Sequence, residues 1–246
     1  MCSMASLKQE WLYYARVVKE LLFPRHCAVC HNTIDHGYVC EICRKHYLLS
    51  KTIQCEPREE YLAGQAEARP EDVLDSIFLL YKYDGVFENA LHEVKFNHQA
   101  SILPFLREEA EVALPSAKMR WLGQFDFATC IPTSPERYRQ RGYDVPQEIF
   151  APLLNERDTC IYSDNILQRV RTTAPLFALD AENRRTELQG CFAVFPQFNL
   201  QGKRILLCDD IFTTGSTLAE AASVLRKAGA KEVHALTLAA ARANWD

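Results

Sequence analysis

Hydrophobic and polar positions follow two different periods along this chain, and the change between them predicts strands and helices. Apolar side chains recur every three or four residues over 86–94 and 218–228, as on one face of a helix, and Gly229 ends the second segment. Four short, mostly apolar runs have the length of buried strands. These runs lie at 76–83, 127–131, 204–208 and 232–239. Strands that alternate with helices predict an α/β fold with a mainly parallel sheet flanked by helices.

The same pattern divides the chain into four segments. Residues 1–24 are predicted to form an amphipathic helix, because apolar positions recur at helical spacing until Pro24. Residues 25–50 are rich in cysteine and too poor in apolar residues for a core of their own. Residues 51–72 are polar with interspersed proline and glycine, which predicts a linker or irregular segment, and residues 73–246 hold the main α/β domain.

Composition and charge exclude several classes of protein. The 246 residues are 48% hydrophobic and 24% charged, which is typical of a globular chain rather than a disordered or coiled-coil one. The net charge is −4, so no global basic field marks a nucleic-acid coat. The apolar runs are too short to span a membrane, and charged residues interrupt the N-terminal apolar positions, unlike a secretory signal. We therefore expect a cytoplasmic protein with no membrane span.

Two Cys-x-x-Cys pairs predict a structural zinc site. The ligands would be Cys27, Cys30, Cys40 and Cys43, whose thiolates can complete a tetrahedral shell. Residues 27–31 also spell the haem-attachment pattern Cys-x-x-Cys-His, but that pattern does not explain the second pair. Redox-active dithiols and unliganded buried thiols remain alternatives.

A second pattern, at 204–217, predicts a phosphate site. A buried-strand run reaches Asp209 and Asp210 and is followed by Thr213-Thr214-Gly215-Ser216-Thr217 and a helix. At the carboxyl end of a parallel strand, such a loop presents backbone N–H groups and hydroxyls at a helix N-terminus, where an anion is favoured. Two carboxylates beside a phosphate make sense if the ligand also brings hydroxyls or a metal ion, as a ribose phosphate does. The alternative is an ordinary strand–turn–helix unit with an acidic cap.

Residues 208–217, Cys-Asp-Asp-Ile-Phe-Thr-Thr-Gly-Ser-Thr, resemble the phosphoribosyl pyrophosphate motif of type I phosphoribosyltransferases. Together with the cysteine pairs, the chain resembles the ComF family of competence proteins from about residue 24 to residue 238. Further matching segments are Tyr83-Asp-Gly-Val-Phe, Lys95-Phe, Ile131-Pro-Thr-Ser-Pro-Glu-Arg, Arg141-Gly-Tyr and Arg169-Val-Arg-Thr-Thr-Ala-Pro. The resemblance implies a type I phosphoribosyltransferase fold for 73–246, preceded by a small zinc module.

The resemblance also implies roles for individual residues. Asp209 and Asp210 would hold the ribose hydroxyls and so be the catalytic acids, and the loop 213–217 would hold the 5′-phosphate. Lys95, Pro132, Arg137 and Arg141 would face the pyrophosphate, with Mg²⁺ bound alongside it. Arginine forks suit phosphate oxygens, so the clusters at 137–141 and 169–171 agree with this, although solvated surface charge is the alternative.

Three functions stay open at this point. The first is binding of phosphoribosyl pyrophosphate with Mg²⁺, with or without transfer to an unknown acceptor. The second is a non-catalytic DNA-uptake factor, since the resemblance implies contact with single-stranded DNA and a helicase-like partner. The third is a structural docking protein. Asp144-Val145 stand where the family usually has Asn-Gln, and Thr213 stands where purine-salvage enzymes usually carry Asp, which disfavours purine salvage.

Overall fold

The computed structural model describes residues 24–27, 29–35, 37–48, 51–57, 74–114, 125–155, 160–172 and 181–241. The predicted N-terminal helix lies outside these ranges apart from its last residue, Pro24. No helix among the described residues is long and apolar enough to cross a membrane.

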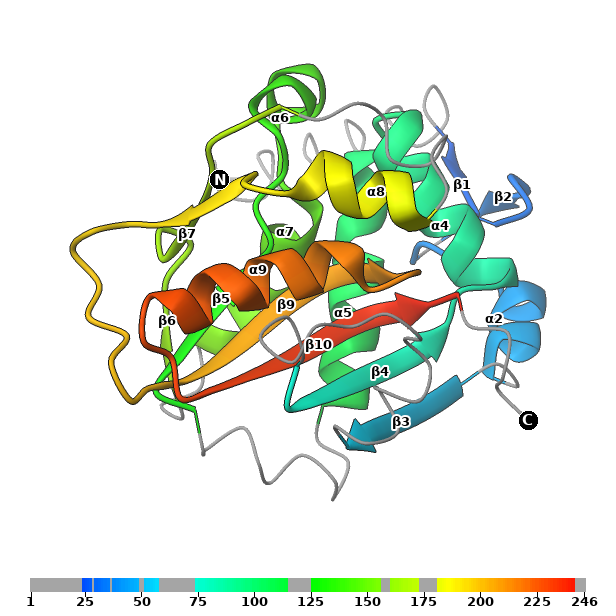
Figure 1. The fold of residues 1–246 in the computed structure, drawn as a ribbon. Helices are drawn as coiled ribbons and strands as arrows, with labels where there is room; N and C mark the ends of the chain where they lie inside the picture. Colours follow the sequence, from blue (N-terminus) through cyan, green and yellow to red (C-terminus); the bar gives the residue numbers. More distant parts are fainter. Residues whose placement is uncertain are drawn as a thin grey trace, which may run out of the picture.

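The centre of the fold is a sheet of six strands in the order β3-β4-β10-β9-β5-β6 (Figure 1). All neighbouring pairs from β4 to β6 are parallel, as predicted, whereas β3 is antiparallel to β4. The strands are β3 (Lys51–Pro57), β4 (Ser76–Lys82), β5 (Phe127–Cys130), β6 (Ile161–Tyr162), β9 (Arg204–Phe212) and β10 (Glu232–Ala240). The fold is the α/β class expected from the alternating pattern.

Strand β3 corrects one expectation. The segment 51–72 was predicted to be a linker or irregular, yet Lys51–Pro57 pairs with β4 at the edge of the sheet. An edge strand needs a hydrogen-bonding partner on one side only, and it tolerates the proline that a central strand would not. The apolar pattern therefore gave no sign of it. The rest of the predicted linker, residues 58–72, lies outside the described residues.

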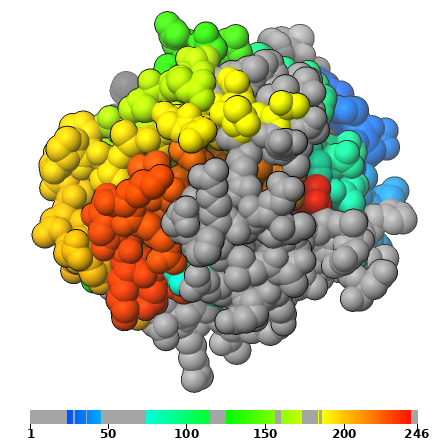
Figure 2. All heavy atoms as spheres, in the orientation of Figure 1, coloured from blue at the N-terminus to red at the C-terminus, as the bar shows by residue number. Residues whose placement is uncertain are grey.

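Helices cover both faces of the sheet (Figure 1). On one face lie α4 (Gly85–Phe96), α5 (Leu103–Ala113) and α7 (Val145–Asn155), whose apolar sides form one buried cluster with the sheet. On the other face lies α9 (Ser216–Lys227), with α8 (Ala181–Leu188) against it. The short strands β7 (Leu167–Arg169) and β8 (Phe192–Val194) pair antiparallel, and α8 lies between them in sequence. The space-filling view shows α9 and the segment before β9 as one continuous surface (Figure 2).

Packing against the sheet fixes the position of α4 and α5. The Tyr81 ring on β4 stacks on Phe87 with 4.1 Å between ring centroids, and the Tyr81 hydroxyl donates to the backbone carbonyl of Glu109 at 2.8 Å. Both rings are fully buried, so each contributes about 1.5–3 kcal/mol by leaving water. The helix α4 is thus fixed at its start, and its last turn reaches the carboxyl ends of the strands.

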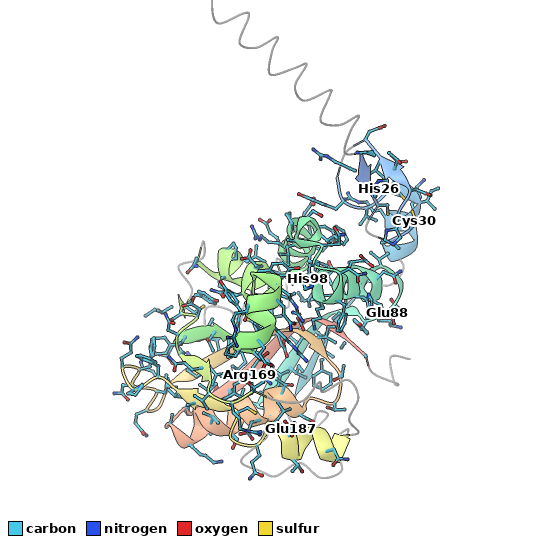
Figure 3. All side chains as sticks on the ribbon, turned by 90° about the horizontal axis from the view of Figure 1, so that it is seen from above. His26, Cys30, Glu88, His98, Arg169 and Glu187 are labelled. Atoms are coloured by element: carbon cyan, nitrogen blue, oxygen red, sulfur yellow. The ribbon has the colours of Figure 1, made fainter. Side chains whose placement is uncertain are left out.

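The cysteine-rich segment forms a small unit at one end of the molecule. It contains β1 (Arg25–His26), β2 (Thr33–Ile34) and α2 (Glu41–Leu48), and β1 and β2 pair antiparallel. Cys27 and Val39 are buried in the same apolar cluster as α4. His26 and Cys30 lie at the end of the molecule opposite to Arg169 and Glu187 (Figure 3).

Candidate functional site

The candidate site forms where the parallel strands β5 and β9 end side by side. Cys130 pairs with Cys208 in the register of these strands. The loop after β5 is therefore adjacent to Asp209 and Asp210, because parallel strands end at the same edge of the sheet. The acids themselves lie inside β9, where Asp209 pairs with Thr237 of β10, so the strand is longer than the apolar run predicted.

The hydroxyl-rich loop leads from β9 into α9. Gly215 is the N-cap of this helix and has a φ of 76°, a left-handed conformation that glycine adopts without strain. Ser216 and Thr217 form the first turn, where backbone N–H groups have no partner within the helix. The hydroxyl oxygens of Thr214 and Ser216 lie 2.9 Å apart. The loop residues Thr213 and Thr214 and the helix residues Ser216 and Thr217 line the same cavity, described below, and so offer donors to an anion bound there.

Asp209 and Asp210 are both buried, with exposed fractions of 9% and 6%. Burial and the neighbouring charge of Asp210 raise the pKa of Asp209 well above its ordinary value, whereas Lys95 opposes that shift. Lys95, in the last turn of α4, donates from Nζ to Oδ1 of Asp210 at 2.6 Å. A second hydrogen bond, from the backbone N–H of Asp210 to Oδ1 of Asp209, is 2.9 Å long. The pair of acids is thus fixed, with one cation already in contact.

Arginines approach from two further elements. Helix α6 (Pro135–Arg141) begins after Ser134, whose hydroxyl accepts the Arg137 N–H at 3.3 Å. Arg137 and Arg141 are four residues apart and both line the cavity described below. Arg169 reaches it from β7, with its guanidinium 5.5 Å from the centroid of the Phe192 ring. Burial lowers the pKa of both Arg141 and Arg169 below its ordinary value.

Asp144 holds the loop that follows β5. Its Oδ2 accepts the Thr133 N–H at 2.6 Å, and its Oδ1 accepts the Gln147 N–H at 3.4 Å in the first turn of α7. Burial raises the pKa of Asp144 to about 6, and the charge of Asp210 adds to the rise, while these hydrogen bonds and Arg141 oppose it. Sequence reasoning noted Asp144 as a departure from the family but gave it no role in the site.

These groups surround one cavity of about 320 Å³. All predicted ligand residues except Gly215 lie on its wall. They are Asp209, Asp210, Thr213, Thr214, Ser216, Thr217, Lys95, Pro132, Arg137 and Arg141. The described lining contains four basic and two acidic side chains, counting Arg169, so its charge favours an anionic ligand. The wall also includes Tyr83 and Phe96, for which the sequence predicted no role in binding.

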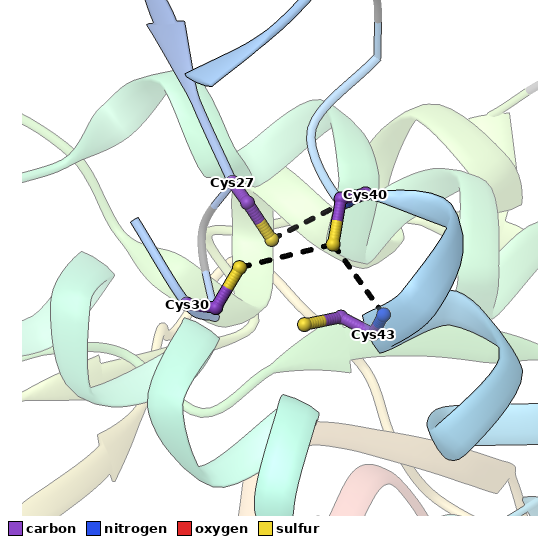
Figure 4. Close-up of side chains that lie close together, drawn as sticks. All are labelled: Cys27, Cys30, Cys40 and Cys43. Atoms are coloured by element: carbon purple, nitrogen blue, oxygen red, sulfur yellow. Dashed lines mark hydrogen bonds between the residues drawn. The ribbon is translucent and has the colours of Figure 1, made fainter. Parts of the chain in front are cut away.

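The four cysteines predicted as zinc ligands come together in the small N-terminal unit (Figure 4). Their sulfur atoms all lie within 4.8 Å of one another, and the sulfurs of Cys30 and Cys40 are 3.7 Å apart. Four sulfurs around a tetrahedral zinc at Zn–S of about 2.3 Å would be about 3.8 Å apart. The geometry therefore fits a zinc ion.

Backbone groups around these sulfurs also suit thiolates. Cys27 Sγ accepts the N–H groups of Val29 and Cys40, at 3.5 and 3.3 Å. Although burial opposes ionisation, such backbone hydrogen bonds lower the pKa of Cys27 to about 6. Burial and the other three cysteines raise the pKa of Cys43. A cluster of this kind has the donor set of a structural zinc centre.

Comparison with known proteins finds a matching domain family and several similar proteins. Residues 163–246 match the family described as "Phosphoribosyl transferase domain". "Competence protein F" of Haemophilus influenzae is 34% identical over 176 residues, which cover 70% of this chain and 76% of that protein. The chain belongs to the ComF family. The main domain of this ComF protein is of the type I phosphoribosyltransferase class.

Two other relatives cover most of this ComF protein. "DNA utilization protein YhgH" of Escherichia coli strain K12 is 24% identical over 221 residues, covering 87% of this chain and 96% of that protein. "Competence protein ComFC" of Streptococcus pneumoniae is 24% identical over 225 residues, covering 86% of each. Among solved structures, phosphoribosylpyrophosphate synthetase from Mycobacterium smegmatis aligns with a TM-score of 0.31 at 19% identity, over 57% of this chain and 39% of its own.

Proposed function

We propose that this ComF protein binds phosphoribosyl pyrophosphate, or a related ribose phosphate, together with Mg²⁺. The observation that carries the proposal is a single cavity that combines buried acids, a hydroxyl-rich helix N-terminus and several basic side chains. A phosphate by itself would be repelled by Asp209 and Asp210. A ligand with both phosphates and ribose hydroxyls satisfies both kinds of group.

Each part of such a ligand has a matching part of the cavity. The 5′-phosphate would accept hydrogen bonds from the loop 213–217, and the ribose hydroxyls would donate to Asp209 and Asp210. The diphosphate would lie toward Arg137 and Arg141. Mg²⁺, when bound, would neutralise diphosphate charge, and the carboxylates of this site are oxygen ligands of the kind that it prefers.

The same arrangement can support transfer to an acceptor. Transfer breaks the bond between the anomeric carbon and the pyrophosphate oxygen, and the acceptor supplies the electron pair for the new bond to that carbon. Arg137, Arg141 and Arg169 would stabilise the charge on the departing pyrophosphate. Asp209 and Asp210 would fix the ribose while positive charge develops on it. Release of pyrophosphate on addition of an acceptor separates transfer from ligand sensing alone.

The test of binding compares two matched double variants. Titration calorimetry of the intact protein with phosphoribosyl pyrophosphate and Mg²⁺ should give saturable binding. Asp209→Asn with Asp210→Asn should weaken it by about 1–3 kcal/mol per lost hydrogen bond. The control is Glu108→Gln with Glu111→Gln, which removes the same charge from exposed positions on α5 outside the cavity lining. Equal affinity in the two double variants would place the ligand elsewhere.

The names of the relatives support a role in DNA uptake or DNA utilization. We place this role in the cytoplasm, because four clustered thiols stay available for metal in a reducing compartment. The partners we propose are single-stranded DNA and a helicase-like uptake protein. A non-catalytic variant of this function would use the cavity to sense a ribose phosphate and the zinc unit to dock a partner.

A further inference from the structure

We infer that Phe96 forms a stacking subsite for the aromatic base of a nucleotide at the edge of the candidate cavity. The inference rests on the proposed function, since the base is taken to be joined to a ribose phosphate held by the acids and the hydroxyl-rich loop. It assigns a ligand class, a nucleoside 5′-monophosphate, to a part of the cavity wall to which the proposed function gives no role.

Exposure and location together distinguish Phe96. Single exposed hydrophobic side chains are common and need no explanation. Among the described residues, Phe96 alone is both a large exposed hydrophobic side chain, 51% exposed, and part of the cavity wall. The other five lie outside the lining. They are Ile42, Val112, Tyr138, Ile161 and Val170.

Neighbouring contacts hold the Phe96 ring in place. The adjacent residue, Lys95, is bound to Asp210 at 2.6 Å, so the end of α4 is tied to the strand that carries the acids. One helical turn earlier, the His92 ring packs against Phe96 with 4.9 Å between centroids. A ring that is fixed before the ligand arrives loses little conformational freedom on binding. The exposed part of the ring is thus a preformed surface on the wall of the cavity that also holds Asp209 and Asp210.

The Phe96 side chain is apolar and aromatic, so it favours contact with a flat, uncharged ring over contact with a charged group of the ligand. Stacking of a base on an aromatic side chain is tolerant of base identity, because each base has a π-face. Phe96 offers no hydrogen bond to select one base from another. We therefore expect little discrimination among nucleotides at this subsite.

The experiment compares two ligands, one of which carries a base in place of the anomeric hydroxyl of the other. Affinities of adenosine 5′-monophosphate and ribose 5-phosphate are measured on the intact protein by calorimetry. Wild type should bind the nucleotide about 5- to 150-fold more tightly, the range expected of one stacked base. Phe96→Ala should bring this ratio close to 1 and leave ribose 5-phosphate affinity unchanged. Phe96→Trp should retain the ratio.

The control is Tyr138→Ala, which removes a ring that is 50% exposed but outside the cavity lining, and it should leave the ratio unchanged. A ratio near 1 in wild type, or a ratio that Phe96→Ala does not alter, would overturn the stacking subsite while the proposed function stands. If neither ligand binds wild type, the proposed function and this subsite both fail. Weaker oligonucleotide binding by Phe96→Ala with an unchanged ratio would assign the ring to DNA and overturn the inference.

Discussion

Lys95 Nζ lies 2.6 Å from Asp210 Oδ1, which joins the last turn of α4 to the carboxyl end of β9 across 115 positions of sequence. The contact places one positive charge beside two buried carboxylates. It therefore links the stability of the packing between α4 and the carboxyl end of β9 to the electrostatics of the candidate site.

Removing the Lys95 charge should destabilise the fold. Lys95→Met leaves Asp210 beside Asp209 without its cation, and we expect a loss of about 1–3 kcal/mol in the free energy of unfolding. Adding Asp210→Asn should recover most of the loss, because the unpaired charge is removed. Urea unfolding measures both. The control, Lys231→Met, breaks an ion pair in which the lysine is 66% exposed, and it should change stability by less than about 0.5 kcal/mol. Equal losses in the two lysine variants would refute the coupling.

Asp144 should make stability depend on pH. Its folded-state pKa is about 6 against an ordinary value of 3.8, so the folded protein holds this proton more tightly than the unfolded chain. The resulting stabilisation is full below pH 3.8 and is lost as pH rises through about 6. The difference corresponds to at most about 3 kcal/mol.

Asp144→Asn should remove this pH dependence, while its side-chain carbonyl can still accept the Thr133 N–H. Urea unfolding at several pH values from about 4 to about 7.5 gives the slope of the unfolding free energy against pH. The control is Glu111→Gln on the surface of α5. A slope that persists unchanged in Asp144→Asn would contradict the assignment.

The small N-terminal unit should hold one zinc ion per chain. Metal analysis of the purified protein should find it, and Cys40→Ser should lower the content, because three thiolates bind more weakly than four. The control is Cys160→Ser, a cysteine outside the cluster. Chelation should loosen the small N-terminal unit before the main sheet melts, as followed by hydrogen exchange. Full zinc in Cys40→Ser, or an intact unit without metal, would exclude this ligand set.

The proposed 5′-phosphate site and the proposed diphosphate site should respond to different substitutions. Thr214→Val should weaken ribose 5-phosphate and phosphoribosyl pyrophosphate alike, because it acts on the 5′-phosphate. Arg141→Met should weaken only the compound with the diphosphate, by about 1.5–3 kcal/mol. Arg139→Met is the matched control, since Arg139 is exposed on the same helix and outside the cavity lining. If Thr214→Val and Arg141→Met had the same effect on both ligands, the proposed orientation of the ligand in the cavity would be contradicted.

Binding of single-stranded DNA, if direct, should be weak and strongly dependent on salt. Each phosphate contact contributes about −0.7 to the slope of log affinity against log salt. Replacing both Arg137 and Arg141 by Ala should therefore reduce the slope by about 1.4, measured by anisotropy of a labelled oligonucleotide. Absence of binding at low salt would leave a partner protein as the DNA-binding component. Competition by phosphoribosyl pyrophosphate would place the DNA over the cavity.

Local features of the site could be predicted because their residues are close in sequence. The acids and the hydroxyl-rich loop are adjacent over 209–217, and the spacing of 27–30 and 40–43 brings each cysteine pair to one side of a metal. A strand followed by a loop and a helix fixes such neighbours with little help from the rest of the chain. The sequence alone therefore determined the class of fold, the candidate phosphate-binding loop and the candidate zinc ligands.

Contacts between distant segments were decided only by the tertiary structure. Whether Lys95 meets Asp210, whether Asp144 holds Thr133, and whether Phe96 lies on the cavity wall depend on strand register and helix packing. Strand β3 belongs to the same group, because its pairing with β4 comes from backbone hydrogen bonds at a sheet edge rather than from an apolar pattern. Side-chain periodicity reports which face of an element is buried, whereas the meeting of two faces is set by how the whole core packs.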